Sequence, residues 1–309
     1  MNVLFSINDC FVEGFLATAV SFCIHNSGHH DFYVTNDGLL PKNQKKILKI
    51  LSRQNVTVFF VEQPSSHFGS PLYSSLPRYS PLSLNRLLPQ LALPETVHRA
   101  LYLDSDLIIN GPLNTFYDTP LTGFFLAAVC VRRDGQDGGP YWDQEANVYN
   151  DLRVALKPGN DYFNAGVLLL NLDKFREIDE SHYDKIVLEQ HNNITLLDQD
   201  ILNLAFEDEM VHLCDRRLNC TIPENMRLRR GEYHWIKKEA VVIHYVVKKK
   251  PWMPFRYRNP LFKIFMHYFW FEKRPFSFFT RYTVWFFMKP FHFLAHCWRK
   301  GMSLLFKHQ

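Results

Sequence analysis

The stretch that decides the fold is Arg99-Ala-Leu-Tyr-Leu-Asp-Ser-Asp-Leu-Ile-Ile-Asn-Gly-Pro-Leu113. Its apolar run from Ala100 to Leu103 predicts a buried strand, and this strand ends where Asp104 and Asp106 stand two residues apart. Two such carboxylates repel each other at the end of a core strand unless a cation lies between them, and hard oxygen ligands suit Mg²⁺ or Mn²⁺. The spacing therefore favours a metal site, although two solvated turn aspartates give the same pattern.

Composition indicates a folded chain rather than a disordered or disulfide-rich one. The 309 residues are 47% hydrophobic and 21% charged with a net charge of +4, which allows one large or two ordinary domains with a sizeable core. The six cysteines form no Cys-x-x-Cys pair, so reduced thiols in a cytosol-like compartment are favoured over a zinc site. Met1-Asn-Val-Leu-Phe5 starts directly as a strand, and no apolar run is long enough to span a bilayer.

The first hundred residues alternate between strand and helix patterns. Apolar runs predict strands at 3–7, 31–35, 55–62 and 100–103, and amphipathic patterns predict helices at 11–23, 42–53 and 82–93. The last helix carries Arg86, and Pro89 should end or kink it. This alternation predicts an α/β fold with a mostly parallel sheet. If the strand order is 3-2-1-4, Asn8 and Asp106 flank one crevice at the carboxyl ends of the strands. The sequence contains no GxGxxG motif that would support a dinucleotide cofactor.

Two further stretches carry polar side chains beside apolar runs. Residues 162–172 combine a strongly apolar strand with the amide of Asn164 and with Gly166, where a second backbone can approach closely. Residues 196–205 cluster Asp198-Gln-Asp200 at the expected start of an apolar helix. These acids are equally well explained as a cap that complements the helix dipole.

A fourth stretch, residues 240–252, ends a β-branched strand with His244. Three lysines follow, the last of them Lys250, and then Pro251 and Trp252. A strand histidine is usually a satisfied core residue, and a run of lysines is usually a solvated turn. Side by side, however, these residues can supply a metal ligand and a positive charge for a phosphate group.

Taken together, the four stretches resemble glycosyltransferase family eight, and in particular its bacterial lipooligosaccharide and lipopolysaccharide α-galactosyl(glucosyl)transferase group. The resemblance covers roughly residues 1–255, and its motifs are Leu101-Tyr-Leu-Asp-Ser-Asp106, Phe163-Asn-Ala-Gly166, Asp198-Gln-Asp200, and His244-Tyr245 with Lys250-Pro-Trp252. It implies a GT-A fold, which is a Rossmann-like, mostly parallel sheet flanked by helices. It also implies a UDP-sugar donor and a divalent metal, usually Mn²⁺ and alternatively Mg²⁺.

The resemblance implies roles for individual residues as well. The positions that match metal ligands are Asp104, Asp106 and His244. The positions that match donor contacts are Asn8 and Phe11 at the uridine, Arg86, Asn164 and Asp198 at the sugar hydroxyls, and Lys250 at the pyrophosphate. The catalytic candidates are Gln199, which matches the residue beside the anomeric carbon, and Asp198. Because Gln199 is a poor nucleophile, we favour front-face attack with retention of configuration, and a covalent intermediate on Asp198 is the alternative.

We therefore expect a retaining, metal-dependent hexosyltransferase that moves galactose or glucose from a UDP-sugar to a lipid-linked oligosaccharide acceptor. Two alternatives stay open: a non-catalytic sugar-nucleotide-binding protein on the same fold, and a transferase that acts on protein. The first is motivated by three departures from the family pattern, which are Asn8 and Cys10 near the uracil and Val247 near the phosphates.

The C-terminal part of the chain has a different composition. From Pro251 onward there are ten Lys/Arg residues, a single Glu272 and 20 aromatic residues. Basic residues interleaved with aromatic ones are typical of helices that lie in a membrane interface containing anionic lipid. We expect a catalytic domain at 1–255 and a membrane-association tail at 256–309, which would hold the protein peripherally on the cytoplasmic face of a bacterial inner membrane. Ordinary packing of the tail is the alternative, and no module accompanies it that would support a nucleic-acid partner.

Overall fold

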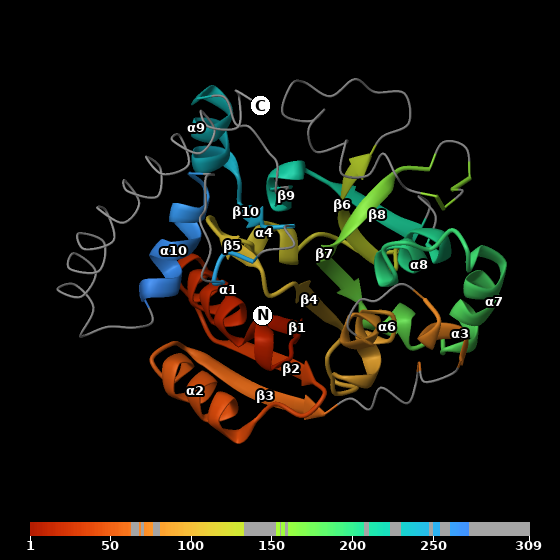
Figure 1. The fold of residues 1–309 in the computed structure, drawn as a ribbon, viewed down its shortest axis with the longest axis horizontal. Helices are drawn as coiled ribbons and strands as arrows, with labels where there is room; N and C mark the ends of the chain where they lie inside the picture. The colour runs from red at the N-terminus through yellow and green to blue at the C-terminus, as the bar shows by residue number, and fades with distance from the viewer. Residues whose placement is uncertain are drawn as a thin grey trace, which may run out of the picture. The chain divides into compact units, whose positions relative to one another are not determined.

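The computed structural model describes residues 1–62, 68, 71–76, 81–132, 153, 154, 156, 157, 160–206, 210–222, 230–246, 250–253 and 260–271 (Figure 1). The chain divides into two compact units, Met1–Phe269 and Trp270–Gln309, and the fold below is that of the first. The expected tail at 256–309 lies outside the described residues except for 260–271, and Val247 lies outside them too.

A seven-stranded sheet forms the centre of the fold. Its order is β3-β2-β1-β4-β7-β6-β8, so the predicted order 3-2-1-4 of the first four strands is confirmed. Four of its six neighbouring pairs are parallel, and the two pairs that contain β7 are antiparallel. The bounds are β1 (Asn2–Ser6), β2 (His30–Asn36), β3 (Val56–Glu62), β4 (Arg99–Leu103), β6 (Leu126–Arg132), β7 (Tyr162–Asn171) and β8 (Val211–Cys214).

Helices cover both faces of this sheet, as expected for a Rossmann-like fold. Figure 1 shows α1 and α2 on one side and α7 and α8 on the other. The helices and 3-10 turns are η1 (Asp9–Phe11), α1 (Val12–His25), α2 (Pro41–Leu51), α3 (Pro71–Ser74), η3 (Pro81–Arg86), η4 (Pro89–Leu91), α4 (Asn114–Tyr117), α6 (Leu172–Phe175), α7 (Ser181–Gln190), α8 (Asp198–Ala205), η7 (Arg216–Leu218), α9 (Arg230–Glu239) and α10 (Phe262–Phe271).

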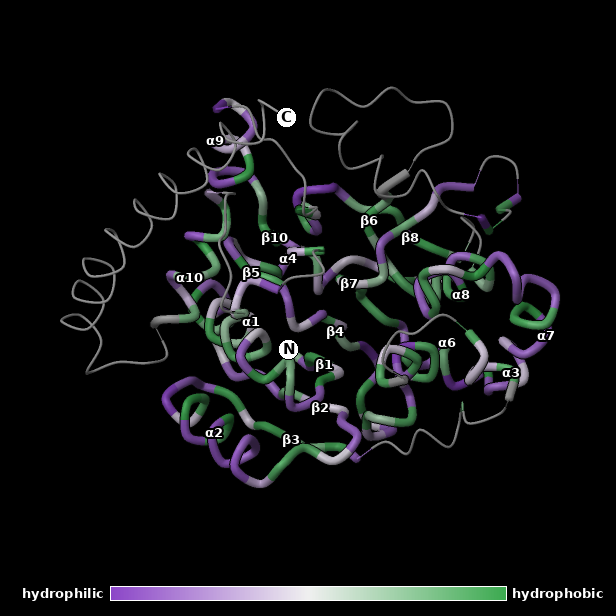
Figure 2. Tube along the Cα trace, viewed as in Figure 1, coloured by the Kyte–Doolittle hydropathy of each residue, from purple (hydrophilic) through white to green (hydrophobic). Residues whose placement is uncertain are grey.

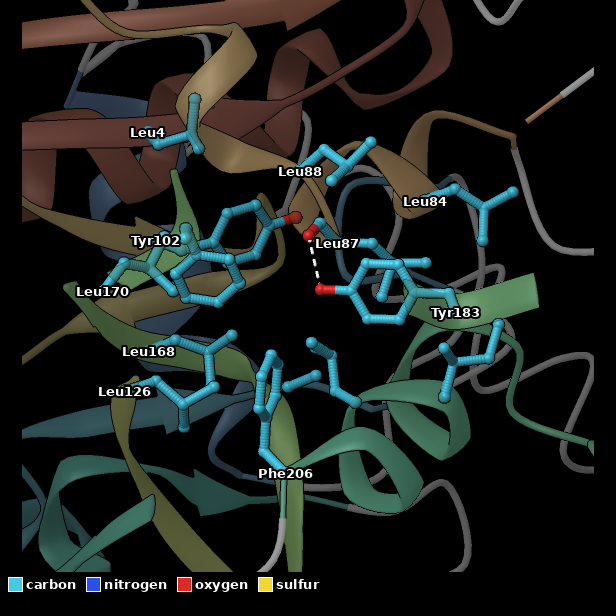
Figure 3. Packing of buried hydrophobic residues seen from close by; sticks show 14 of the residues in the cluster. Leu4, Leu84, Leu87, Leu88, Tyr102, Leu126, Leu168, Leu170, Tyr183 and Phe206 are labelled. Carbon is cyan, nitrogen blue, oxygen red and sulfur yellow. Dashed lines mark hydrogen bonds between the residues drawn. The ribbon is translucent and has the colours of Figure 1, made fainter. Parts of the chain in front are cut away.

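The strands β1 and β4 send alternate side chains into two separate cores. On the α1 side, Phe5 and Leu103 are completely buried. On the opposite side, Leu4 and Tyr102 pack with the 3-10 segments and α7, where the Tyr183 hydroxyl donates to the Leu87 carbonyl oxygen at 2.7 Å (Figure 3). Burial on both faces explains why these strands are nearly continuous apolar runs. Figure 2 shows the contrast with α2, whose hydrophilic and hydrophobic positions alternate around the helix.

The expected α-helix at 82–93 is wrong. The structure has two short 3-10 segments there, η3 and η4, with Pro89 as the first residue of η4. Proline has no N–H to donate to the preceding turn, so a continuous helix could not have passed through this position. The first segment nevertheless buries Arg86, which is 8% exposed. None of the helices in the described part of the chain is long and apolar enough to cross a membrane.

A second, three-stranded sheet crosses the carboxyl end of β4. Its order is β5-β10-β9, with bounds β5 (Leu107–Ile109), β9 (Cys220–Thr221) and β10 (Val242–His244). In the antiparallel pairing of β10 with β5, His244 lies opposite Leu107. This register brings a residue from late in the chain next to Asp106, and it thereby positions the site described below.

Candidate active site at the end of the fourth strand

Backbone hydrogen bonds hold the turn between β4 and β5 in place. The Asp104 N–H donates to the Gly166 carbonyl oxygen at 2.8 Å, which extends the β4–β7 pairing by one residue. The Tyr245 N–H donates to the Asp106 carbonyl oxygen at 3.0 Å, which extends the β5–β10 pairing. Each aspartate is therefore fixed by the edge of a different sheet, and both point into the space between the two sheets where His244 ends β10.

Asp104, Asp106 and His244 form what we call the cation cluster. The His244 Nε2 atom lies 3.3 Å from Asp106 Oδ1 and 3.6 Å from Asp104 Oδ2, and one ligand atom from each residue lies within 4.8 Å of the others. Two ligands at about 2.1 Å from one octahedral ion lie about 3 Å apart when adjacent and about 4 Å apart when opposite. The spacing of the cluster fits these values, and two carboxylates with one imidazole suit Mn²⁺ or Mg²⁺.

Gly166 is required by this arrangement. A Cβ atom added at this position would overlap the His244 imidazole and would lie 2.7 Å from Asp104 Oδ2. Any side chain on β7 here would therefore push two of the three members of the cation cluster apart. The sequence predicted the approach of a second backbone at Gly166, whereas the atoms that exclude a Cβ here belong to the side chains of His244 and Asp104.

Lys250 lies on the other side of Asp106. Its Nζ atom is 2.6 Å from Asp106 Oδ2, and the Asp106 residue is 5% exposed. Burial alone would favour the neutral carboxyl, but the positive charge of Lys250 outweighs it and holds the pKa of Asp106 well below its ordinary value. Asp106 is therefore ionised at neutral pH and is able to act as a cation ligand.

Arg86 connects the cation cluster with Asp198. Its guanidinium contacts Asp104 Oδ1 through Nη2 and Asp198 Oδ2 through Nε, both at 2.9 Å, and it lies 4.5 Å above the centroid of the Tyr102 ring. Burial raises the pKa of Asp198 to about 6, although the charge of Arg86 acts in the opposite direction. The structure thus brings together two candidate sugar contacts that are 112 residues apart in the chain.

Asn164 and Gln199 also lie side by side. The Asn164 amide donates to Gln199 Oε1 at 2.9 Å, and the backbone N–H of Ala165 donates to the same oxygen at 3.1 Å. Both side chains are buried, from β7 and from the start of α8 respectively. Because Arg86 donates to the Ala165 carbonyl oxygen at 2.8 Å, this pair and the Arg86–Asp198 pair share one stretch of β7.

Asn8 and Phe11 lie at the end of β1, in what we call the β1 corner. Asn8 uses its side chain to cap η1, accepting from the Cys10 N–H at 3.0 Å. Phe11 contacts the Trp252 ring edge-to-face with centroids 5.5 Å apart, and the Trp252 indole donates to the Cys10 carbonyl oxygen at 3.1 Å. Trp252 lies close to the turn between the two aspartates, since a Cβ atom added at Gly14 would overlap both the Trp252 ring and the backbone oxygen of Ser105.

Sequence reasoning missed four residues that organise the site: Tyr102, Tyr162, Asn219 and Trp252. Tyr102 donates to Asp104 Oδ1 at 3.1 Å, and Asn219 Oδ1 lies 3.1 Å from His244 Nδ1. Tyr102 and Trp252 were part of motifs but had no role, Tyr162 begins an apolar strand, and Asn219 follows the charged run Asp215-Arg-Arg217. Only their tertiary partners distinguish them, so the sequence carries no local signal for them.

Comparisons with known proteins agree with this geometry. The family model described as Glycosyl transferase family 8 matches residues 2–254. A putative glycosyltransferase from Haemophilus influenzae is 28% identical over 260 residues, which are 82% of this chain and 73% of that protein. The lipopolysaccharide glucosyltransferase WaaO from Escherichia coli K12 is 26% identical over 171 residues, which are 54% of this chain and 48% of that protein.

A solved structure extends the likeness to three dimensions. The crystal structure of the galactosyltransferase LgtC in complex with donor and acceptor sugar analogues superposes with a TM-score of 0.65 and 25% sequence identity. The match covers 87% of this chain and 95% of that one. The expected GT-A-like fold, a sheet of seven strands flanked by helices, is confirmed.

Proposed function

This chain belongs to glycosyl transferase family 8, and from that premise we propose that it is a retaining, metal-dependent hexosyltransferase. The donor in this proposal is UDP-galactose or UDP-glucose, and the acceptor is a growing lipooligosaccharide or lipopolysaccharide. The observation that carries the proposal is the cation cluster of Asp104, Asp106 and His244, with the Lys250 ammonium on its flank. Such a cluster matches the chemistry of a diphosphate leaving group, which needs positive charge.

The donor diphosphate would lie between the cation cluster and Lys250. A bound Mn²⁺ or Mg²⁺ supplies positive charge that stabilises the departing diphosphate. Lys250 donates to Asp106 at 2.6 Å and to the Tyr245 carbonyl oxygen at 3.4 Å, so its positive charge lies beside the cluster, where it can attract a phosphate group. At the sugar, Arg86, Asp198 and Asn164 are the buried polar side chains proposed to bind hydroxyls.

The transfer step breaks the bond between the anomeric carbon and the phosphate oxygen. The electron pair of that bond stays on the departing diphosphate. The acceptor hydroxyl oxygen forms the new bond from the same face, and its proton passes to the departing phosphate oxygen. The Gln199 amide oxygen stabilises the positive charge that develops on the sugar ring.

The surroundings of Asp198 argue against the covalent alternative. An intermediate on this carboxylate would need it free to attack the anomeric carbon. Instead, Asp198 is paired with Arg86 at 2.9 Å and is itself buried. We therefore retain front-face transfer beside Gln199.

The acceptor and the location complete the proposal. The relative WaaO is named for transfer of glucose to lipopolysaccharide, and LgtC is named as a galactosyltransferase. A lipid-linked acceptor fits the basic and aromatic composition of residues 256–309, which we propose bind the anionic cytoplasmic face of the inner membrane peripherally. Residues 1–255 would then be the catalytic domain.

A donor screen tests the proposal. The full-length chain is incubated with UDP-galactose, UDP-glucose or UDP-N-acetyl sugars and Mn²⁺, with and without a lipooligosaccharide acceptor, and released UDP is measured. We expect release from one of the two hexose donors, acceleration by the acceptor and loss of activity in chelator. Asp106→Asn should be inactive, whereas Asp173→Asn, a change at an exposed aspartate paired with His98, should not alter the rate. Binding of UDP without any release would favour the non-catalytic alternative.

A further inference from the structure

A chain of buried polar side chains leads away from the cation cluster. The His244 Nδ1 atom lies 3.1 Å from Asn219 Oδ1, and the Asn219 NH₂ group donates to Asn164 Oδ1 at 2.8 Å. Asn164 donates in turn to Gln199 Oε1 at 2.9 Å, and Gln199 donates to the Tyr162 hydroxyl at 3.1 Å. All five residues are at most 9% exposed, so their protein neighbours decide how each side chain is oriented.

We call this series of side chains the amide chain, and its direction is the order in which each member donates to the next. Neighbouring groups that can only donate or only accept a hydrogen bond fix this direction. An amide side chain can turn over and exchange its oxygen and nitrogen, so its orientation must be read from such partners. The Gly166 N–H donates to Asn164 Oδ1 at 2.9 Å, and the Ala165 N–H donates to Gln199 Oε1 at 3.1 Å. Turning over either amide would place an NH₂ group against a backbone N–H.

The far end of the amide chain gives the same direction. The Tyr162 hydroxyl donates to Asp200 Oδ1 at 2.5 Å, and the other carboxylate oxygen accepts from the Thr195 and Leu196 N–H groups, both at 2.7 Å. A carboxylate with these donors can only accept, so the Tyr162 oxygen is left to accept from Gln199. Three independent constraints therefore agree on the orientation of Gln199 and Asn164.

This direction determines which nitrogen of His244 carries the proton. Because Asn164 Oδ1 accepts, Asn219 must turn its NH₂ group toward Asn164 and its oxygen toward His244. An amide oxygen cannot donate, so the proton lies on Nδ1 of the imidazole. The Nε2 atom of the neutral ring then keeps its lone pair, and this is the atom that faces Asp106 at 3.3 Å and Asp104 at 3.6 Å.

We propose that Asn219 is a positioning residue that holds His244 in the Nδ1–H tautomer, with Nε2 directed at the cation site, and couples this ring through Asn164 to Gln199. The same amide chain thereby sets the orientation of a metal ligand and of the group beside the anomeric carbon. The inference rests on the proposed function, because it takes the cluster to bind a divalent cation. It also gives a reason for the two-residue spacing of Asn164 and Gly166. The Gly166 N–H orients the Asn164 amide, and this amide in turn orients Asn219.

Mn²⁺ binding to the full-length chain, followed by the electron paramagnetic resonance signal of free Mn²⁺, tests the link to the metal. Asn219→Leu has nearly the same shape but can neither donate nor accept, and we expect its Mn²⁺ affinity to fall about tenfold or more. The matched control is Asn26→Leu, because Asn26 is equally buried and makes its bonds to Phe22 and Leu113, away from the site. Equal Mn²⁺ affinity of Asn219→Leu and wild type would overturn the inference.

Asn219→Asp separates the two functions of the residue. Its carboxylate still accepts from the His244 Nδ1–H, but it cannot donate to Asn164 Oδ1 and repels that oxygen. We expect Mn²⁺ affinity equal to or higher than that of wild type, together with a loss in kcat because Gln199 is no longer held. Unchanged kcat would contradict the coupling to Gln199, and weakened Mn²⁺ binding would contradict the tautomer argument.

The tautomer can also be observed without substrate, in protein saturated with diamagnetic Mg²⁺, because in metal-free protein the two carboxylates that face Nε2 would themselves hold a proton there. In ¹⁵N-histidine-labelled protein, long-range ¹H–¹⁵N correlations distinguish Nδ1–H from Nε2–H, and the His244→Gln variant assigns the signal. We expect Nδ1–H at His244 in wild type and a mixture of tautomers in Asn219→Leu, and Nε2–H in wild type would overturn the inference. If wild type shows Nδ1–H but binds no Mn²⁺, the proposed function fails although the tautomer is the expected one. If wild type binds Mn²⁺ and Asn219→Leu binds it equally, only the further inference fails.

Discussion

The cation cluster and the β1 corner adjoin each other, yet they are built differently. The cluster is held by two sheet edges, by the buried Arg86 and Asn219 and by the half-buried Lys250. The β1 corner relies on a 3-10 turn, an exposed Cys10 and the ring contact between Phe11 and Trp252. Each side chain of the cluster is fixed by several neighbours, whereas the hydrogen bonds of the corner are fewer and exposed. We therefore expect the cluster to be intolerant of change and the corner to tolerate the departures at Asn8 and Cys10.

The largest effect should come from Gly166→Ala. The added Cβ atom overlaps the His244 ring and crowds Asp104, so the ligands of the cluster must separate. A displacement of about 1 Å at a reacting centre can cost about 100-fold in rate, and we expect a loss of this size in both activity and Mn²⁺ affinity. Gly231→Ala is the control, because no atom lies near its added Cβ. A Gly166→Ala enzyme with wild-type kcat/KM would contradict the packing argument.

Lys250→Met should have the next largest effect. The change removes the charge beside Asp106 while it keeps the length of the side chain. Since a hydrogen bond to a charged group contributes about 1.5–3 kcal/mol, kcat/KM for the donor should fall about tenfold or more. Steady-state kinetics at saturating Mn²⁺ measure this. A loss that disappears at high Mn²⁺ would mean that Lys250 acts only through the metal site and not on the diphosphate.

The pH dependence of the reaction should report the raised pKa of the buried Asp198 carboxyl. Burial raises the pKa of this carboxyl to about 6, and its charged form is the one that can accept from Arg86 and a sugar hydroxyl. Protonation therefore removes the active form as the pH falls. We expect kcat/KM at saturating Mn²⁺ to decrease about tenfold per pH unit below about pH 6 and to be level above it. A profile that stays flat down to pH 5 would contradict the assigned role of Asp198.

The smallest effects should come from the β1 corner. Asn8→Asp and Cys10→Asn change polar groups at two positions that lie at or near the surface. We expect each to change KM for the donor by no more than a few-fold and to leave kcat unchanged, because neither residue contacts the cation cluster. Initial rates over a range of donor concentrations check this. A drop in kcat comparable to that of Gly166→Ala would remove the distinction between the two regions.

The separation of interacting residues along the sequence decides which features could be predicted. The order of the first four strands and the turn at Asp104 and Asp106 were predicted because they depend on local patterns and on short crossovers. The antiparallel insertion of β7 and the pairing of β10 with β5 depend on contacts between residues more than 60 positions apart. Residues 240–252 alone made His244 a candidate metal ligand, but only the family resemblance joined it to Asp104 and Asp106.

The amide chain shows most clearly which residues the sequence cannot identify. Asn219 lies between Leu218 and Cys220, and no periodicity or motif at this position signals a bond to His244. The helix expected at 82–93 failed for a different reason. There the break expected at Pro89 is present, but the segments on either side of it are 3-10 turns rather than the two parts of an α-helix. Functional residues could therefore be predicted where they are close together in the sequence. They were missed where they come together only in the folded structure.

The most direct test of the central claim is a Mn²⁺ titration of the wild-type chain and of the Asp104→Asn, Asp106→Asn and His244→Gln variants, followed by the signal of free Mn²⁺. Asp173→Asn serves as the control for the loss of an acidic residue. We expect one saturable site in wild type and in the control, and loss of that site in each of the three variants. Saturable binding that survives in all three variants would contradict it.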